Sequence, residues 1–574
     1  MGLPLLGPRR TGLRRAAQDK LINIVDDGPT EHPSHVTSAD SGESAGPLIL
    51  TGYLRVGTED AAGVRGNVAL PMTGAARFER LIGSSRVTPE NIKARAVRGS
   101  AFSIAAESMD VLLRVGSMAI LARMLVPEQF GLVGMVTAIT AVAERFKDVG
   151  LSVATVQRKE ITHEQVSTLF WVNAGLGILF AGLIAALAAP IARFFGDPRL
   201  FAITLAIASS FFWSGLTIQH QALLRRQMMF GRIAGIQLSA SVLSIVLAVA
   251  LAKMGAGYWA LVAREVSRNV FQAVGSWTCL PWIPGRASRQ TNIKGMLAFG
   301  GDVTAFNLIW FLVFNLDQIV VGRVFGAVPL GLYKQAVGLT QPVLTIGSAI
   351  CSVTESALSR IQDLKAEYRS YYLRTLSVVS FVTVPIALFL AIFAEEVVLV
   401  VLGKHWTSAT ALVRILAIAA AVRPATGTAG FVMVTCGFSR RYLLWGVFNS
   451  LGLACLILIG MNAGLNGVAF AHVVASVLVL APSLYWGFKG TPVRVADFMS
   501  AIQRPAVASL LTCAGLWVTK QAVSDQGALF VLLIGLTIGV PAYLGAWLVL
   551  PGGRDELTRT IGSLNSLFRG IWRK

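Results

Sequence analysis

The sequence predicts an all-α polytopic membrane protein, with about fourteen transmembrane helices in two six-helix lobes and a C-terminal helix pair. Three observations predict this fold. Of the 574 residues, 54% are hydrophobic and only 14% are charged, against about 25% charged in typical soluble domains. Apolar stretches of spanning length recur along the chain, and part of the chain repeats at an offset of 200 residues. A bilayer, unlike water, can accommodate so much apolar side chain.

Fourteen apolar stretches approach the ~20 residues that a transmembrane helix needs. They are predicted at about 101–122, 130–152, 168–192, 199–223, 230–253, 257–280, 295–322, 329–356, 372–393, 408–436, 441–461, 465–487, 505–523 and 528–550. The first, second and seventh are the least apolar, so they are expected to face the protein interior.

The predicted spans divide the chain into four parts. Residues 1–90 are expected to form a disordered cytoplasmic tail, because they are rich in Gly, Pro, Ser, Arg and Asp and contain no apolar run of spanning length. Residues 91–290 form the N-lobe and residues 291–490 the C-lobe. Residues 491–574 contain the last two spans and a basic cytoplasmic C-terminus.

The basic residues predict the orientation of the spans. The chain has a net charge of +20, but its Lys and Arg occur in short stretches between apolar runs, which does not indicate a nucleic-acid-binding face. The six loops that follow even-numbered spans carry seventeen Lys and Arg, whereas the seven opposite loops carry seven. By the positive-inside rule, both termini are predicted to lie in the cytoplasm.

The sequence offers no sign of a metal or a disulfide framework. The five cysteines are far apart and lie in apolar segments, without a CxxC pair or a Cys/His cluster. We therefore expect no metal and no cofactor, apart from Na⁺ or a proton that would couple transport to an ion gradient.

An internal repeat predicts the two lobes. The segment RMLVPEQFGL at 123–132 is matched by RVFGAVPLGL at 323–332, and the arginine pair at 225–226 is matched by the pair at 440–441. Six spans separate matched segments, so both copies keep the same orientation in the membrane. Parallel repeats of this kind occur in transporters, whose halves rock around a central cavity.

Ionisable residues inside predicted spans are the candidates for a binding site, because such residues cost about 2.5–3.5 kcal/mol each and usually pair or face a cavity. Glu107, Asp110 and Arg114 are spaced to share one face of the first span. For Arg114, Arg264 and Asp302 we favour the cavity over helix packing. Cations there are suited to a pyrophosphate group, and a carboxylate to a coupling cation. The full candidate set is Asp110, Arg114, Arg264, Glu265, Asp302, Asp317, Lys334 and Arg423.

Several blocks resemble one known family. LARMLVPEQFGLVGM at 121–135 resembles the signature after the first helix of Wzx/WzxC-type polysaccharide flippases, which belong to the MOP exporter superfamily. DVGLSVATVQRK at 148–159, NLDQIVVGRVFG at 315–326 and LGKHW at 402–406 are similar to later blocks of that family, in the same order. Lys334-Gln335-Ala336 departs from the Ser/Arg-Ala pair that the family often shows there.

The resemblance implies a function. Members of this family turn undecaprenyl-diphosphate-linked oligosaccharide units outward across the bacterial inner membrane by alternating access, for the synthesis of exopolysaccharide, capsule or O-antigen. It also implies membrane lipids and polysaccharide polymerase or co-polymerase proteins as partners. Arg114 and Arg264 would then bind the phosphates, and Asp302 or Asp317 would bind sugar hydroxyls or the coupling cation.

Two other classes remain as alternatives. One is a different exporter of the same superfamily, such as a small-molecule/cation antiporter or a lipid II flippase, against which the 158–173 block argues. The other is a membrane polysaccharide polymerase or ligase. Enzymes of that kind need a catalytic constellation, yet the outer loops are short, the histidines are scattered, and no GxSxG, HExxH or P-loop motif occurs. We therefore predict a transporter and not an enzyme.

Overall fold

The computed structural model describes residues 53–54, 70–71, 89–146, 150–158, 161–287 and 315–572. Two dipeptide strands, β1 (Tyr53–Leu54) and β2 (Leu70–Pro71), pair antiparallel. All other regular structure in the described residues is helical, which confirms the all-α prediction. Most of the predicted tail and the seventh predicted span up to residue 314 lie outside the described residues. Residues 73–574 form one compact unit.

The helices of the N-lobe follow the predicted spans in order. They are α2 (Pro89–Met124), α3 (Pro127–Phe146), α4 (Leu151–Gln157), α5 (His163–Ala186), α6 (Ala188–Phe195), α7 (Arg199–Arg226), α8 (Phe230–Lys253) and α9 (Tyr258–Cys279). The second predicted span is split between α3 and α4. Gly150, directly before α4, has a φ of 65°, a backbone conformation that glycine adopts without steric cost.

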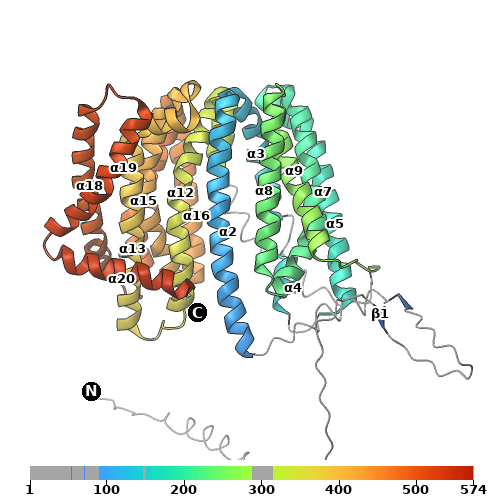
Figure 1. Ribbon diagram of the computed structural model, residues 1–574, viewed down its shortest axis with the longest axis horizontal. Coiled ribbons are helices and arrows are strands. Elements are labelled where there is room, and N and C mark those ends of the chain that lie inside the picture. The colour runs from blue at the N-terminus through green and yellow to red at the C-terminus, as the bar shows by residue number, and fades with distance from the viewer. Residues whose placement is uncertain are drawn as a thin grey trace, which may run out of the picture. The chain divides into compact units, whose positions relative to one another are not determined.

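The helices of the C-lobe and of the C-terminal pair also follow the predicted order (Figure 1). They are α11 (Leu316–Phe325), α12 (Ala327–Leu358), α13 (Lys365–Ile392), α14 (Ala394–Val397), η1 (Val398–Leu402), η2 (Lys404–Ala409), α15 (Thr410–Thr435), α16 (Ser439–Gly460), η3 (Met461–Ala463), α17 (Gly464–Phe488), α18 (Val495–Ala522) and α19 (Ala528–Val549). A further helix, α20 (Gly553–Trp572), contacts α2, α13 and α19.

Eight helical stretches among the described residues are long and apolar enough to cross a membrane. They are His163–Ala186, Arg199–Arg226, Phe230–Lys253, Lys365–Ile392, Lys404–Thr435, Ser439–Phe488, Val495–Ala522 and Ala528–Val549. The stretch Ser439–Phe488 contains both α16 and α17. These stretches support a multi-pass membrane protein, while the number fourteen stays a prediction.

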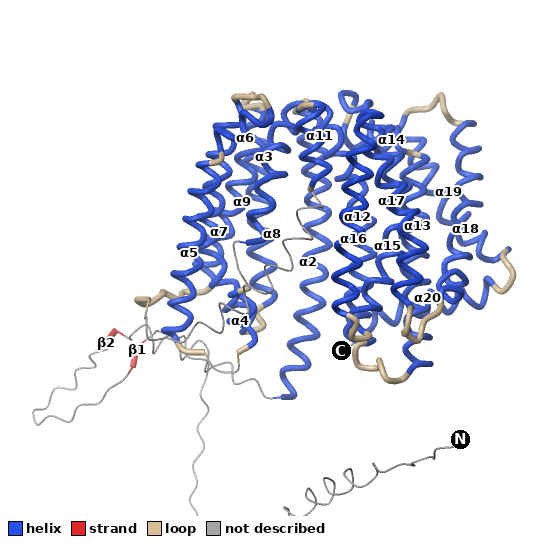
Figure 2. Tube along the Cα trace, turned by 180° about the vertical axis from the view of Figure 1, so that it is seen from behind, coloured by secondary structure: helices blue, strands red, loops and turns tan. Residues whose placement is uncertain are grey.

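Four long helices of the two lobes fall outside this apolar set: α2, α3, α9 and α12. The C-terminal helix α20 also falls outside it. In both views α2 lies between the helices of the two lobes (Figures 1 and 2), and α3 packs closely against α12. A helix with polar side chains is tolerated in a membrane where it faces protein or a cavity. Within the lobes, the less apolar helices are thus the ones at the centre.

Large apolar side chains cover the outward faces of the other helices. Leu179 of α5, Val246 of α8, Phe448 of α16 and Leu478 of α17 are each between 59% and 62% exposed. A water-soluble protein buries such residues, whereas lipid is their natural solvent. The polar residues point inward instead, for example Asn173, which is fully buried and bonded to Gln219.

The two copies of the repeat form a close backbone contact between the lobes. A Cβ atom built on Gly131 of α3 would lie 1.7 Å from the carbonyl oxygen of Ala327, and one built on Gly331 of α12 would lie 1.9 Å from that of Pro127. Both pairs are related by the same offset of 200 residues, so each copy presents its glycine to the other. We call these four residues the glycine contact. Only glycine allows backbones to approach this closely.

A second set of contacts joins the lobes near the glycine contact. The indole nitrogen of Trp406, on η2, donates to the carbonyl oxygen of Ala122 at 2.7 Å. The Trp406 ring also packs edge-on against Phe130 of α3, with 5.2 Å between the ring centroids. The guanidinium of Arg123 donates to the carbonyl of Val400. The lobes are therefore joined where α2 ends and α3 begins, the end that the predicted orientation places outside the cell.

Candidate functional site

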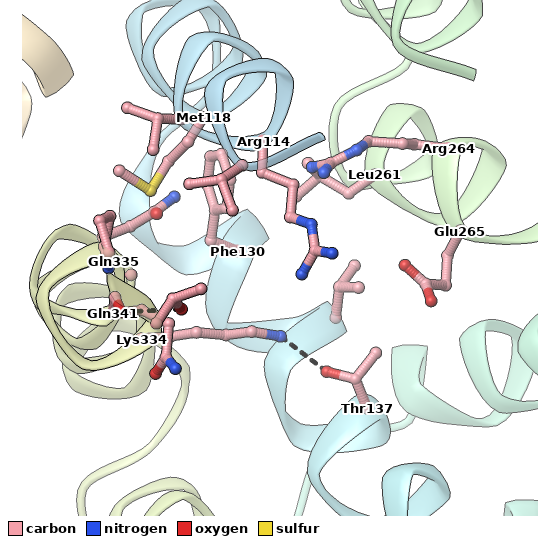
Figure 3. A pocket seen from close by; sticks show the side chains of 16 residues that line it. Arg114, Met118, Phe130, Thr137, Leu261, Arg264, Glu265, Lys334, Gln335 and Gln341 are labelled. Carbon is pink, nitrogen blue, oxygen red and sulfur yellow. Dashed lines mark hydrogen bonds between the residues drawn. The ribbon is translucent and has the colours of Figure 1, made fainter. Parts of the chain in front are cut away.

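A central cavity of about 340 Å³ lies between α2, α3, α9 and α12. Its polar lining residues are Arg114, Thr137, Arg264, Glu265, Lys334, Gln335, Gln341 and Thr345, and its apolar ones include Met118, Phe130 and Leu261 (Figure 3). Along α12 the lining runs from Lys334 to Thr345, which spans about 17 Å at 1.5 Å per residue. On α12 the lining begins one turn beyond Gly331, and on α3 it reaches Phe130, next to Gly131.

The charged groups give the cavity a positive balance. Among the lining residues that the structure describes, Arg114, Arg264 and Lys334 are cationic and Glu265 is acidic. Their charged ends point toward a common space from three helices (Figure 3). The Lys334 ammonium donates to the Thr137 hydroxyl at 2.7 Å, so this contact leaves its charge uncompensated. In surroundings of low dielectric constant such an arrangement attracts an anion.

The position of Arg114 is set by Asp110, one turn earlier on α2. Two guanidinium nitrogens of Arg114 donate to one carboxylate oxygen of Asp110, at 2.5 and 2.7 Å. The Ser241 hydroxyl of α8 donates to the other oxygen at 2.8 Å, and Arg268 of α9 lies 3.6 Å from it. Asp110 is buried and does not line the cavity, whereas the Arg114 side chain is 60% exposed. Asp110 is thus a positioning residue.

Apart from Asp110, the predicted candidates separate into three groups. Four of them, Arg114, Arg264, Glu265 and Lys334, meet in the central cavity. Asp302 lies outside the described residues. The remaining two belong to the C-lobe and do not line the central cavity.

Those two, Asp317 and Arg423, lie close to a different set of partners. Asp317 is buried and accepts a hydrogen bond from the Tyr333 hydroxyl at 2.8 Å. Arg423 lines a second cavity of about 260 Å³ between α15, α16 and α17, together with His472 and Tyr442. The structure therefore does not place Asp317 and Arg423 in the central cavity, where they were predicted to lie.

Sequence reasoning missed the uncharged polar lining of α12. Gln335, Gln341 and Thr345 line the cavity beside Lys334, and positions 334, 338, 341 and 345 follow the three- and four-residue spacing of one helix face. This row of polar residues in an otherwise apolar stretch is the sequence signal that could have indicated a cavity-lining face of the helix. Pro342 also lines the cavity. Because proline lacks an N–H, Pro342 cannot donate the usual helical hydrogen bond to the carbonyl of Gly338.

Comparison with solved structures defines the class of protein. The lipid II flippase MurJ, in its inward closed conformation, superposes with a TM-score of 0.64 at 14% identity, over 78% of this chain and 97% of that one. An inward-facing multidrug resistance MATE family transporter of the MOP superfamily gives a TM-score of 0.54 at 16% identity, over 70% and 99%. The chain is a multi-pass membrane protein with the MOP fold.

Residues 120–411, just over half of the chain, match the polysaccharide biosynthesis protein family, and the chain belongs to that family. It is 25% identical to the lipopolysaccharide biosynthesis protein WzxC of Escherichia coli, over 68% of this chain and 80% of WzxC. It is 23% identical to the succinoglycan biosynthesis transport protein ExoT of Rhizobium meliloti, over 74% and 86%. The resemblance to polysaccharide flippases and the prediction of a transporter in place of an enzyme are confirmed.

Proposed function

We propose that the protein is a flippase that moves a lipid-linked oligosaccharide, carried on a polyprenyl diphosphate, across the bacterial inner membrane for polysaccharide synthesis. The observation that carries this proposal is the cationic central cavity within a membrane protein of the polysaccharide biosynthesis family. A diphosphate is a compact anion, and arginine side chains can bind its oxygens in pairs. Arg114 and Arg264 would contact the diphosphate, with Lys334 as a third cation.

The size of the cavity sets what it can enclose in this conformation. Its volume of about 340 Å³ is near the lower end of the ~300–1,000 Å³ of ligand pockets. That space suits the diphosphate and the first sugar. Gln335, Gln341 and Thr345 would hydrogen-bond sugar hydroxyls, while the apolar lipid tail stays in the bilayer between helices.

The lobe contacts support an alternating-access cycle. The glycine contact and Trp406 join the lobes at the end predicted to face outward, and the cavity lies on the cytoplasmic side of that junction. The substrate would enter from the cytoplasmic side in this state. Rocking of the lobes would then separate the glycine contact and expose the same residues to the outside.

The positive charge of the cavity favours a flippase of an anionic substrate over an antiporter of cationic small molecules. An antiporter of cationic small molecules needs acidic side chains in its cavity, but the described lining carries three cations and one carboxylate. A lipid II flippase would share the anionic substrate chemistry. Family membership and the transport protein ExoT among the relatives favour a polysaccharide precursor. A polymerase or co-polymerase would receive the product.

The orientation of the chain is part of the proposal. The excess of Lys and Arg in the loops after even-numbered spans supports cytoplasmic termini. The glycine contact then closes the side from which the sugar would be released.

A clean chromosomal deletion tests the proposal. Lipid-linked intermediates would be extracted and the secreted polymer weighed, with plasmid-borne wild-type protein and the Arg264→Ala variant as comparisons. We expect complete lipid-linked repeat units to accumulate inside the deletion strain and polymer to be lost. Wild type should restore export and Arg264→Ala should not. Unchanged polymer and unchanged lipid-linked pools in a strain without a paralogue would contradict the proposal.

A further inference from the structure

Three buried side chains from three helices of the C-lobe form a hydrogen-bonded cluster. The Tyr333 hydroxyl of α12 donates to a carboxylate oxygen of Asp317 on α11 at 2.8 Å. The same hydroxyl lies 2.9 Å from Nε2 of His472 on α17, and this nitrogen lies 3.4 Å from the carboxylate. Each of the three residues is less than 9% exposed. We call them the Asp–Tyr–His cluster.

The hydrogens of the cluster can be counted. A tyrosine hydroxyl has one hydrogen, which goes to Asp317. The contact with His472 is then a hydrogen bond only if Nε2 carries its own hydrogen and donates to the tyrosine oxygen. A further proton on the second ring nitrogen would convert the imidazole to an imidazolium beside the Asp317 carboxylate. The cluster can therefore take up one proton without breaking any of its hydrogen bonds.

The cluster differs in kind from the other carboxylates of the membrane region. Asp110 pairs with Arg114 and Glu396 pairs with Lys520, which carry permanent charges at neutral pH. The Asp317 carboxylate instead accepts hydrogen bonds from the Tyr333 hydroxyl and the backbone N–H of Gln318, and it lies beside the His472 ring, a group that can gain a proton. The side chains in direct contact with this carboxylate therefore carry no permanent charge, and the fixed charge of Arg423 acts on it without a hydrogen bond or ion pair in the described structure.

The charged neighbours of the cluster are few among the described residues. Arg423 of α15 interacts electrostatically with Asp317 and Tyr333, and Tyr442 of α16 lines the cavity that reaches His472. On α11, Arg323 lies over the ring of Phe194.

Two further charged residues on packed helices have partners away from the cluster. Lys334, next to Tyr333 on α12, donates to Thr137 in the central cavity. On α3, Glu128 pairs with Arg199 at the outer end of the lobe. Arg423 thus remains as the fixed charge that faces the cluster.

The ligand chemistry points to a proton and not to Na⁺. Hard metal cations prefer several oxygen ligands at once. The cluster offers one carboxylate and one hydroxyl, and its third member presents a ring nitrogen. The adjoining cavity of about 260 Å³, lined by His472, Asn449, Ser450 and Ser476, has room and polar partners for water that would carry protons to the ring.

The cluster shares one turn of α12 with the glycine contact and with the central cavity. Gly331 belongs to the glycine contact, Tyr333 to the cluster and Lys334 to the central cavity, all within one turn of the helix. A change in the charge of the cluster alters how Tyr333 is held, and so biases the position of the whole turn.

We propose that Asp317, Tyr333 and His472 form a proton-binding site, and that α12 couples its occupancy to the glycine contact and the central cavity. The coupling role rests on the proposed transport function, whereas proton binding itself does not. The proton joins a ring nitrogen of His472 and leaves it again to water, with no other bond made or broken.

The test uses the purified full-length protein in detergent and needs no substrate. The apparent Tm of wild type, His472→Gln and Asp317→Asn would be measured from pH 5 to pH 8. Each variant keeps a side chain that can hydrogen-bond Tyr333. His472→Gln removes the ring that takes up the proton, and Asp317→Asn removes the carboxylate charge that would stabilise the imidazolium. His405→Gln, at an exposed histidine of η2, is the matched control.

We expect the Tm difference between wild type and His472→Gln to change by about 2 °C or more across this range, and Asp317→Asn to show the same behaviour. His405→Gln should run parallel to wild type. A difference from wild type that is constant with pH in both cluster variants would reduce the cluster to a structural role and overturn the proposal. If His472→Gln does not fold, Asp317→Asn alone decides.

A second measurement separates a proton from sodium and the site from the transport function. Replacing K⁺ by Na⁺ at constant ionic strength should leave the wild-type Tm unchanged, and a sodium-specific stabilisation that Asp317→Asn abolishes would overturn the assignment to a proton. Lipid-linked intermediates would be extracted from the deletion strain in parallel. If the Tm difference depends on pH but lipid-linked intermediates do not accumulate, the proton site stands and the flippase function is rejected. If lipid-linked intermediates accumulate but the Tm difference does not depend on pH, the flippase function stands and the proton site is rejected.

Discussion

Substituting Gly331 by alanine should release the outer junction between the lobes. The new Cβ would lie 1.9 Å from the carbonyl oxygen of Pro127, whereas ordinary van der Waals contact begins at 3.4 Å. The obstacle is backbone, which cannot rotate away as a side chain can. The two helices must therefore part by about 1.5 Å, the difference between these distances.

The energetic effect follows from this overlap. Overpacking of a close helix contact costs about 1–3 kcal/mol, and the cost falls only on the state in which the glycines touch. The equilibrium between outward-closed and outward-open states should shift by about 5- to 150-fold toward the open state. Export should fall, because the protein returns less often to the state that loads substrate from the cytoplasm.

Spin labels on the two lobes report this shift. In a variant whose five native cysteines are replaced, labels would be placed at Val126→Cys and Val328→Cys, two exposed positions beside the contact. Electron–electron distance measurements should show a longer, broader distribution for Gly331→Ala. Gly182→Ala is the matched control, because a Cβ there meets nothing within 4 Å. If both variants give the wild-type distribution and wild-type export, the glycine contact does not hold the outer side closed.

Three further outcomes are expected from the cavity and the junction. Arg264→Ala should lower export about 10- to 150-fold with normal membrane insertion, because a charged hydrogen bond contributes about 1.5–3 kcal/mol; normal export would remove Arg264 from the site. Asp110→Asn should give a smaller loss, about fivefold or ~1 kcal/mol, since Arg114 remains but loses its anchor; a loss larger than that of Arg114→Ala would argue against a positioning role. Trp406→Phe replaces the buried indole by a smaller aromatic ring and removes the N–H. It should therefore destabilise the outward-closed state by at least the ~0.5–1.5 kcal/mol of the hydrogen bond, seen as a lower Tm. An unchanged Tm and an unchanged label distance would show that the hydrogen bond contributes nothing.

Much of the fold could be predicted because the membrane restricts the possibilities so strongly. A run of apolar residues of spanning length has to be a helix, since every backbone group must be hydrogen-bonded within the lipid. The helix α20 was not predicted as a separate element. It is amphipathic and not uniformly apolar, so a search for apolar runs does not detect it. The start of α2 at Pro89, earlier than predicted, also lacks an apolar signal.

The candidate site was predicted only in part, for a geometric reason. Arg114, Arg264 and Lys334 were candidates because permanent charges inside spans must face a cavity or a partner. The same argument selected Asp317, yet this residue points to Tyr333 and His472 inside the C-lobe. Which face of a helix meets the cavity depends on how the helix is rotated in the bundle, and a charge count does not contain that information.

The repeat explains both where the cavity forms and why it is charged. At the offset of 200 residues, Gly131 corresponds to Gly331, and this match builds the glycine contact. One turn further along, the copies differ: Gly134 corresponds to Lys334.

That difference is complementary in space. A Cβ on Gly134 would lie only 3.4 Å from Cδ of Lys334, so the glycine of one copy leaves room for the lysine of the other to reach Thr137 at 2.7 Å. Two lysines at these facing positions would repel each other, and two glycines would leave the cavity without this cation. Where the two copies carry the same residue, glycine, they pack closely and close the outer end. One turn deeper, where one copy has glycine and the other lysine, the lysine supplies one of the charges that would hold an anionic substrate.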